Sequence, residues 1–196
     1  MKIVFNGGGY RELGEYEIGE CTKLGDFLAS IGVELMTGGG TGFPYHVGKA
    51  AVAGGAVVHG RSPARNEKEH AEKYGFKFDG VTDMIYMEEN LLNHNEGFLR
   101  RMQLMQNFAD TTIAVAGTWG TLYELIISFY YKKTIIIIEE FAGAALQFKK
   151  LHEYFSGSGD TNPAVHLGPK LFFCKNVDET IEVVRKLNAS NIPNRH

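Results

Sequence analysis

The stretch that decides the fold runs from Val33 to Pro44 and reads Val-Glu-Leu-Met-Thr-Gly-Gly-Gly-Thr-Gly-Phe-Pro. Its first four residues form a short apolar run typical of a strand, and a helical spacing of apolar residues resumes near Tyr45. Glycines between them let the backbone approach a ligand closely, and the N–H groups that begin the next helix attract anions. We therefore expect a strand, a ligand-binding turn and a helix, although a tight turn without a ligand fits the same pattern.

The same strand-to-helix pattern recurs along the chain. Strands are expected at 2–5, 33–36, 56–59, 83–86, 111–116, 134–138 and 171–174, and helices at 16–31, 45–53, 91–108, 119–131, 144–155 and 177–187. The polar, irregular segment 61–80 is interpreted as a surface loop that serves a site. This alternation predicts an α/β fold, a Rossmann-like three-layer sandwich with a mostly parallel central sheet, as a single nucleotide-binding domain over residues 1–196.

Composition and charge narrow the class of protein. The 196 residues suffice for one α/β domain, and the net charge of −3 argues against a nucleic-acid or membrane surface. The chain runs from Met1 directly into a strand, without an apolar run of membrane-spanning length. Cys21 and Cys174 form no CxxC pair, and the histidines lack metal-ligand spacing. We expect a cytoplasmic protein with no metal and no cofactor of its own.

A second turn, Ala116–Glu124, reads Ala-Gly-Thr-Trp-Gly-Thr-Leu-Tyr-Glu. Thr118, Gly120 and Thr121 offer N–H groups and hydroxyls at a helix start, and Glu124 lies one helical turn further along the same face. A phosphate at the helix tip would place a sugar near this carboxylate, but a solvated glutamate near the favourable dipole end fits equally well. Neither a Walker pattern nor a Gly-x-Gly-x-x-Gly fingerprint occurs, which disfavours an ordinary ATPase or dinucleotide dehydrogenase.

These residues resemble the superfamily of LOG-type nucleotide phosphoribohydrolases, long labelled as lysine decarboxylases. Enzymes of that family carry Arg-Lys-x-x-Met, an Asp, and then Pro-Gly-Gly-x-Gly-Thr-x-x-Glu. Here Arg101–Met105, Asp110 and 116–124 correspond to that run, and the earlier glycine turn matches the family's other motif. The resemblance covers about residues 2 to 140. It departs from the family at Ala116-Gly117-Thr118, where Pro-Gly-Gly is usual, and at Met102, where lysine is usual.

The resemblance implies both a site and a reaction. Arg101 and Glu124 fall on the family's catalytic pair, Arg101 either contacting phosphate or aligning Glu124. The phosphate or nucleotide would lie against Gly38, Gly39, Gly40, Thr41, Gly42, Gly117, Thr118, Gly120 and Thr121. The implied reaction is hydrolysis of the N-glycosidic bond of a nucleoside 5′-monophosphate to free base and ribose 5-phosphate. The stretch Gly60–His70 resembles a branch close to the molybdenum-cofactor carrier proteins, so a non-catalytic nucleotide or molybdenum-cofactor carrier is the alternative.

The expected helix at Leu91–Phe108 has more apolar side chains than one sheet-facing stripe needs. They are Leu91, Leu92, Phe98, Leu99, Met102, Leu104, Met105 and Phe108. The family resemblance also implies dimers. We therefore predict a homodimer, or a higher even homo-oligomer, through this helix, with a small nucleotide or phosphorylated ligand as partner and neither nucleic acid nor membrane.

Overall fold

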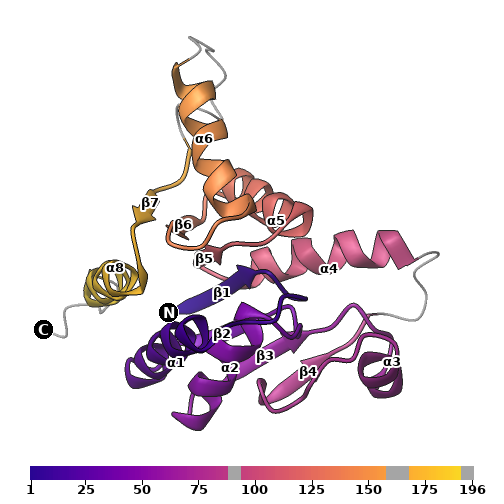
Figure 1. Ribbon diagram of the computed structural model, residues 1–196. Coiled ribbons are helices and arrows are strands. Elements are labelled where there is room, and N and C mark those ends of the chain that lie inside the picture. The colour runs from indigo at the N-terminus through magenta and orange to yellow at the C-terminus, as the bar shows by residue number, and fades with distance from the viewer. Residues whose placement is uncertain (88–93, 158–167, 191–196) are drawn as a thin grey trace, which may run out of the picture.

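Seven strands, all parallel, form the sheet of the computed structural model, which describes residues 1–87, 94–157 and 168–190 (Figure 1). Their order across the sheet is β4 (Asp83–Ile85), β3 (Val58–Arg61), β2 (Glu34–Thr37), β1 (Lys2–Gly7), β5 (Thr111–Val115), β6 (Thr134–Ile138) and β7 (Leu171–Cys174). The chain builds outward from β1 to β4 and then crosses back to β5, so the strand order reverses between β1 and β5. The predicted Rossmann-like α/β fold is confirmed, with a sheet that is wholly parallel.

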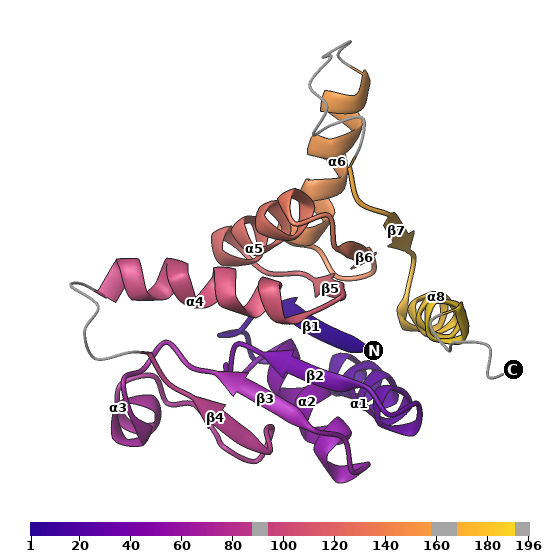
Figure 2. The same cartoon turned by 180° about the vertical axis from the view of Figure 1, so that it is seen from behind.

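Helices cover both faces of this sheet (Figures 1 and 2). One face carries α1 (Glu15–Ser30), α2 (Phe43–Ala53) and α8 (Val177–Ser190), and the other carries α4 (His94–Phe108), α5 (Trp119–Tyr130) and α6 (Ala144–Gly157). The short α3 (Glu67–Glu72) follows β3. None of these helices, within the residues described, is long and apolar enough to cross a membrane.

Alternating side chains of β1 join different layers of the core, as the two-residue period of a strand requires. Ile3 and Phe5 pack with the layer of α1, α2 and α8, whereas Val4 packs with Met36 and Met105 beneath α4. Full burial of an aliphatic side chain of this size stabilises a fold by about 1.5–3 kcal/mol. This packing fixes α4 over β1 and β2, and α4 carries Arg101.

Two elements differ from the sequence-based expectation. The third strand begins at Val58 and ends at Arg61, two residues later than the expected strand. The segment 61–80 contains α3, because the Asn66 side chain accepts a hydrogen bond from the Glu69 N–H at 2.9 Å and so caps a helix. Residues 91–93 of the helix expected at 91–108 lie outside the described residues.

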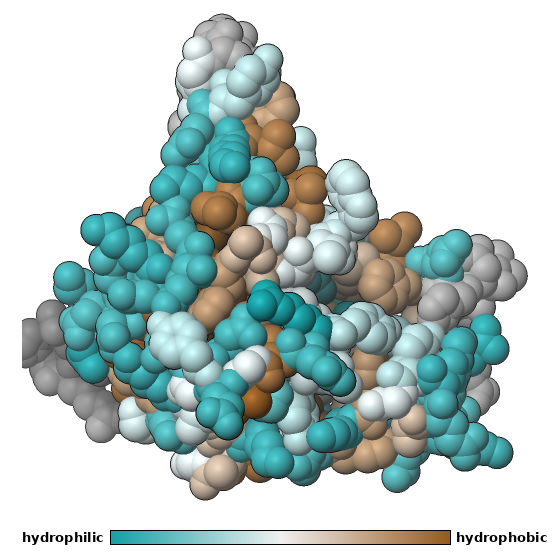
Figure 3. Space-filling view, viewed as in Figure 1, coloured by the Kyte–Doolittle hydropathy of each residue, from teal (hydrophilic) through white to brown (hydrophobic). Residues whose placement is uncertain are grey.

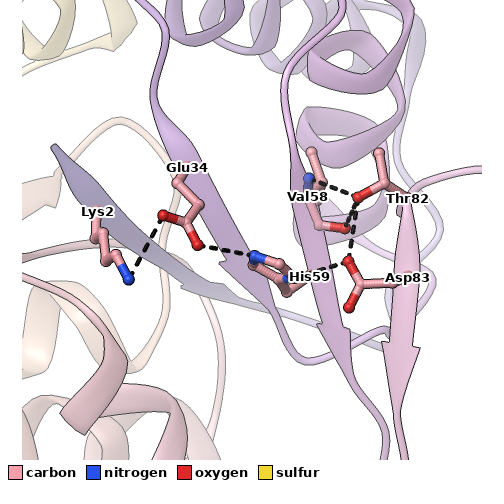
Figure 4. Close-up of polar contacts among 6 residues, drawn as sticks. All are labelled: Lys2, Glu34, Val58, His59, Thr82 and Asp83. Atoms are coloured by element: carbon pink, nitrogen blue, oxygen red, sulfur yellow. Dashed lines mark hydrogen bonds and ion pairs between the residues drawn. The ribbon is translucent and has the colours of Figure 1, made fainter.

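A ladder of polar side chains crosses four strands on the α4 side of the sheet (Figure 4). His59 Nδ1 lies 2.7 Å from Asp83 Oδ1, and His59 Nε2 lies 3.0 Å from Glu34 Oε1. Lys2 Nζ lies 3.5 Å from the other oxygen of Glu34. Burial acts to lower the pKa of His59, but hydrogen bonds to the two carboxylates outweigh it and raise that pKa. When it is protonated, the imidazole ties β4 and β3 to β2 through these two carboxylates.

Candidate functional site

A cavity of about 60 Å³ lies at the carboxyl ends of β1 and β2, beside the point where the strand order reverses. Doubly wound sheets bind ligands at this position. Its walls include Asn6, Tyr10, Gly38, Gly40, Arg101 and Glu124. The fold thus brings the two predicted catalytic residues and two predicted binding glycines to one place, although they come from three different segments of the chain.

Arg101 is buried on the inner face of α4, with only 8% of its surface exposed. Its guanidinium carbon lies 4.9 Å from the centre of the Phe98 ring, and its Nη2 lies over Gly38, where an added Cβ would be only 2.8 Å away. Burial lowers the pKa of Arg101, while the charge of Glu124 opposes that change. The Nε atom is buried without a hydrogen-bond partner in the described part of the chain. A buried cation with an unused donor is suited to holding an anion.

Glu124 is equally buried on α5, with 7% of its surface exposed. Burial raises the pKa of this carboxyl from 4.5 to about 7, and Arg101 opposes the rise. Among the residues described, no hydrogen bond reaches the carboxylate and no ion pair within 4.0 Å joins it to Arg101. A carboxyl that titrates near neutral pH and has no partner is suited to exchanging a proton with a reactant.

A buried polar cluster around Gln106 connects the helices that carry this pair. Gln106 Oε1 lies 2.8 Å from the Ser128 hydroxyl, 3.2 Å from the Thr112 hydroxyl and 3.3 Å from Asn6 Nδ2. The Ser128 hydroxyl also lies 2.9 Å from the main-chain oxygen of Glu124. Since these residues come from α4, α5, β5 and β1, the cluster fixes the spacing of the two helices at the cavity.

The first glycine-rich turn shapes the cavity with its backbone. The N–H groups of Thr41 and Gly42 donate to the Gly9 carbonyl at 2.7 and 3.2 Å, and the Thr41 hydroxyl donates to the same oxygen at 2.8 Å. Gly39 has a φ of +65°, and a Cβ on Gly40 would lie 2.9 Å from the Gly9 oxygen. The N–H groups of Thr41 and Gly42 are therefore already bonded within the protein. The turn lets a ligand approach the backbone closely but offers it neither of these two N–H groups as a donor.

The second turn differs because its helix start is open. Trp119, Gly120 and Thr121 begin α5, so their N–H groups have no acceptor within the helix, and the described residues provide no other acceptor. Thr118 is exposed, Thr121 is buried, and no atom lies within 4 Å of where a Gly120 Cβ would stand. Free N–H donors thus lie at the start of α5, on Trp119 and on Gly120 and Thr121, two of the residues predicted from the sequence to bind an anion.

The backbone just before α5 has an unusual conformation. Ala116 has a φ of +48° and Gly117 a φ of +79°. Their carbonyl oxygens accept hydrogen bonds of 3.0 Å from Ala145 and Ala144 N–H at the start of α6. Proline holds φ near −65°, so the proline usual in the LOG-type motif does not fit this conformation at position 116. The presence of alanine at position 116, where the family motif has proline, therefore goes together with a different backbone conformation.

A groove of about 600 Å³ lies on the other side of the α5 tip, between α5 and α6. Gly117, Thr118 and Trp119 line it, together with Leu151 of α6, and Trp119 is 84% exposed. Figure 3 shows hydrophobic residues, in brown, along one side of the projecting α6 helix. Gly117 and Thr118 therefore line this groove, whereas Arg101 and Glu124 line the smaller cavity.

Sequence reasoning missed several residues of the cavity wall. Asn6 is the last residue but one of β1, and its position just before Gly7 was the available signal for a site residue. Pro63 and Phe76, which also line the cavity, come from the 61–80 segment. Phe76 contacts Tyr10 with ring centres 5.2 Å apart. The described residues contain no group of three or more His, Cys, Asp or Glu side chains that would hold a metal ion.

Solved structures share this fold across nearly the whole chain. TM1055 superposes with a TM-score of 0.74 at 17% identity, covering 94% of this chain and 98% of that one. The molybdenum cofactor carrier protein of Chlamydomonas reinhardtii gives 0.64 at 18% identity, covering 96% and 98%. DNA processing protein A of Helicobacter pylori, which binds single-stranded DNA, gives 0.65 at 14% identity, covering 95% and 80%. Identities this low establish the fold alone.

The family follows from the sequence itself. No curated protein matches this chain significantly. A family model does match, over residues 4–158, which include both glycine-rich turns, Arg101 and Glu124. The resemblance to the LOG-type superfamily is thereby confirmed, and the fold is one that the molybdenum cofactor carrier protein shares. The chain belongs to the SLOG cluster4 family.

Proposed function

We propose that this protein binds a nucleoside 5′-monophosphate and hydrolyses its N-glycosidic bond, releasing the free base and ribose 5-phosphate. One observation carries the proposal. Arg101 and Glu124 are buried together at the cavity beside the strand-order reversal, and the pKa of Glu124 is raised to about 7 by burial. A fold gains no stability from a carboxylate of this kind, so its presence in a ligand-binding position favours a chemical role.

The reaction assigns a task to each member of the pair. The C1′–N bond breaks with its electron pair going to the base, and the sugar passes through a state with oxocarbenium character. The Glu124 carboxylate stabilises that charge and accepts a proton from the water that attacks C1′, while the departing base takes up a proton. Arg101 either holds the phosphate or keeps Glu124 aligned.

The phosphate is proposed to bind at the start of α5. The N–H groups of Trp119, Gly120 and Thr121 are the free donors there, and the helix dipole adds positive potential. Gly120→Val should abolish binding of AMP by blocking backbone approach. The sheet should stay folded, because nothing lies within 4 Å of the added Cβ. Equal binding of AMP and adenosine in calorimetry would count against a phosphate site.

A non-catalytic carrier of a nucleotide or of molybdenum cofactor is the second candidate. The positive φ of Ala116, in the turn where the phosphoribohydrolases have proline, favours it. So does the shared fold with the molybdenum cofactor carrier protein. Under this reading the same cavity and α5 tip hold the ligand, and Glu124 performs no step.

One experiment separates these two functions. The protein is incubated with AMP, GMP, CMP and UMP, and free base is measured by chromatography. Release of base that Glu124→Gln lowers on the order of a hundredfold or more supports the enzyme. Arg101→Ala should weaken binding and turnover together if the guanidinium contacts phosphate, and turnover alone if it aligns Glu124. Tight binding without release of base from any monophosphate would contradict the enzyme function and support the carrier function.

We further propose an even homo-oligomer, assembled through α4 and the adjoining α5. Met102 and Met105 of α4 are buried against the sheet, so fewer apolar side chains of this helix remain for an interface than the sequence predicts. Leu99 on α4 and Ile126 and Tyr130 on α5 remain exposed large apolar side chains. Light scattering at micromolar concentration tests this assembly, and a monomer would rule it out.

A cytoplasmic location is also proposed, with no nucleic acid as partner. Cys21 and Cys174 are both free and buried, as suits a reducing compartment. The net charge of −3 disfavours a nucleic-acid surface, although the related DNA processing protein A binds single-stranded DNA. A binding assay with labelled single-stranded DNA at physiological salt tests this expectation.

A further inference from the structure

An exposed tyrosine lies at the rim of the cavity. Tyr10 follows β1 after the first glycine cluster, at the carboxyl edge of the sheet, and it lines the cavity together with Arg101 and Glu124. It is 70% exposed, and its ring has one aromatic neighbour, Phe76. An exposed ring with one such neighbour keeps a face open, so Tyr10 offers that face to a ligand at the cavity.

Phe76 keeps the tyrosine ring in a defined place. The centres of the two rings are 5.2 Å apart, with an angle of 46° between their planes. Phe76 itself is only 6% exposed, because it stacks on Tyr74 with ring centres 5.5 Å apart and meets the edge of His70 at 5.3 Å. A ring whose neighbour is fixed loses little freedom when a ligand stacks on it. Tyr10 is thus largely prepared to receive a flat molecule.

The elements around the cavity contribute side chains of different chemistry. The polar side chains come from β1, α4 and α5 and are those of Asn6, Arg101 and Glu124. The side chains that α2 and the 61–80 segment contribute are apolar, namely Pro44, Pro63 and Phe76. Ligand sites commonly combine an apolar wall with a few polar groups that fix orientation. The polar residues suit a sugar phosphate, and Tyr10 with the apolar residues suits an aromatic base.

The tyrosine is close enough to the polar residues for one ligand to contact both. Partial burial of its hydroxyl raises the pKa of Tyr10, and the nearby charge of Arg101 acts against this rise. The phenol therefore stays uncharged at neutral pH and does not repel a phosphate. Since the base is attached to the same sugar carbon that Glu124 is proposed to face, it leaves the sugar within reach of the Tyr10 ring.

We infer that the base of the nucleotide stacks on the open face of Tyr10, and that the ligand is a purine nucleoside 5′-monophosphate. Every base can stack on an aromatic side chain, and the two fused rings of a purine cover more of that face than the single ring of a pyrimidine. The base lies at the rim, so the cavity of about 60 Å³ does not limit its size. This inference rests on the proposed nucleotide-binding function and specifies its substrate class.

Calorimetry with three ligands that the proposed reaction cannot consume tests the inference. Formycin 5′-monophosphate is a purine-like nucleotide with a carbon–carbon glycosidic bond, pseudouridine 5′-monophosphate is a pyrimidine nucleotide with such a bond, and ribose 5-phosphate has no base. We expect the wild-type protein to bind formycin 5′-monophosphate on the order of tenfold or more tightly than ribose 5-phosphate, the usual effect of one stacking contact. Pseudouridine 5′-monophosphate should have an intermediate affinity.

Two variants of Tyr10 separate stacking from a structural role. Tyr10→Ala should weaken binding of formycin 5′-monophosphate on the order of tenfold and leave the affinity for ribose 5-phosphate unchanged. Unchanged binding of ribose 5-phosphate also shows that the variant is folded. Tyr10→Phe keeps the ring and should keep the affinity of the wild type for all three ligands.

Tyr154→Ala is the matched control. Tyr154 is 71% exposed, and its ring centre lies 5.5 Å from that of Phe155, but it belongs to α6 and does not line the cavity. The substitution removes the same side chain from a similar setting. It should therefore leave the affinity for each of the three ligands unchanged.

Several results would overturn the inference while the proposed function stands. Equal wild-type affinity for formycin 5′-monophosphate and ribose 5-phosphate would mean that the base is not bound. Equal losses for both ligands in Tyr10→Ala would mean that Tyr10 supports the fold and not the base. Equal affinity for the two nucleotides would contradict the purine assignment. If none of the three ligands binds the wild type, the proposed function itself fails, and the inference fails with it.

Discussion

Replacing Glu124 with glutamine should make the fold more stable above neutral pH. Burial raises the pKa of this carboxyl from 4.5 to about 7 in the folded protein, with Arg101 opposing. Between these two pH values the unfolded chain has released the proton and the folded chain still holds it. The unfolded state therefore binds fewer protons, and the free energy of unfolding falls as pH rises through this window.

The difference between the two pKa values corresponds to about 3 kcal/mol of lost stability once the pH exceeds the folded value. Glutamine keeps the shape of the side chain and has no charge to bury. Urea denaturation of both proteins at a series of pH values measures the effect. The variant should exceed the wild type by little near about pH 5 and by about 3 kcal/mol near about pH 8.

Glu12→Gln is the matched control, because Glu12 is exposed and the substitution removes the same charge. Its difference from the wild type should be small, because an exposed side chain makes few contacts that the fold depends on. A Glu124→Gln protein that is less stable than the wild type at the higher pH would refute the reasoning, since it would mean that the folded protein stabilises the charged carboxylate. A pH-independent difference would refute it equally.

Three further changes test other contacts. Gly38→Ala places a methyl group 2.8 Å from Nη2 of Arg101, so nucleotide affinity should fall on the order of tenfold in calorimetry, whereas Gly19→Ala, with no neighbour within 4 Å, should not change it. His59→Gln should lower stability below about pH 6.5, where the raised pKa keeps His59 protonated, and the deficit should shrink as pH rises through the folded value; urea titrations at several pH values measure it. Gln106→Leu leaves buried hydroxyl and amide groups without their acceptor, so the free energy of unfolding should fall by about 2–4 kcal/mol in urea; an unchanged value would show that these groups find other partners.

Most of the fold follows from local patterns in the sequence. The run Thr134–Ile138 is long and apolar enough to be a buried strand, and it is one. The limits of β3 were harder to predict, since Ala56 and Val57 are apolar but precede the paired residues Val58–Arg61. Helix α3 buries a single side chain, that of His70, so no apolar periodicity marks it, and Asn66 with Glu69 was the remaining signal.

The candidate site depends on contacts between distant parts of the chain. Family resemblance pointed to Arg101 and Glu124, but spacing alone left Glu124 undecided between a solvated and a functional position. Their burial arises from the packing of α4 and α5 over the sheet, which no single segment encodes. Tyr10 follows β1 and Phe76 follows α3, so their contact at the cavity wall joins segments that are distant in the sequence and was not predictable.

The volume of the cavity has a consequence for the rate of binding. About 60 Å³ holds a few water molecules, whereas pockets for ligands of nucleotide size span about 300–1,000 Å³. Tyr10 is 70% exposed and meets Phe76 at the cavity wall, so separating these rings is the simplest way to enlarge it. Association must then wait for a minor, open conformation. In stopped-flow mixing, the observed rate should therefore level off at high nucleotide concentration, and the plateau should equal the rate at which the two rings part.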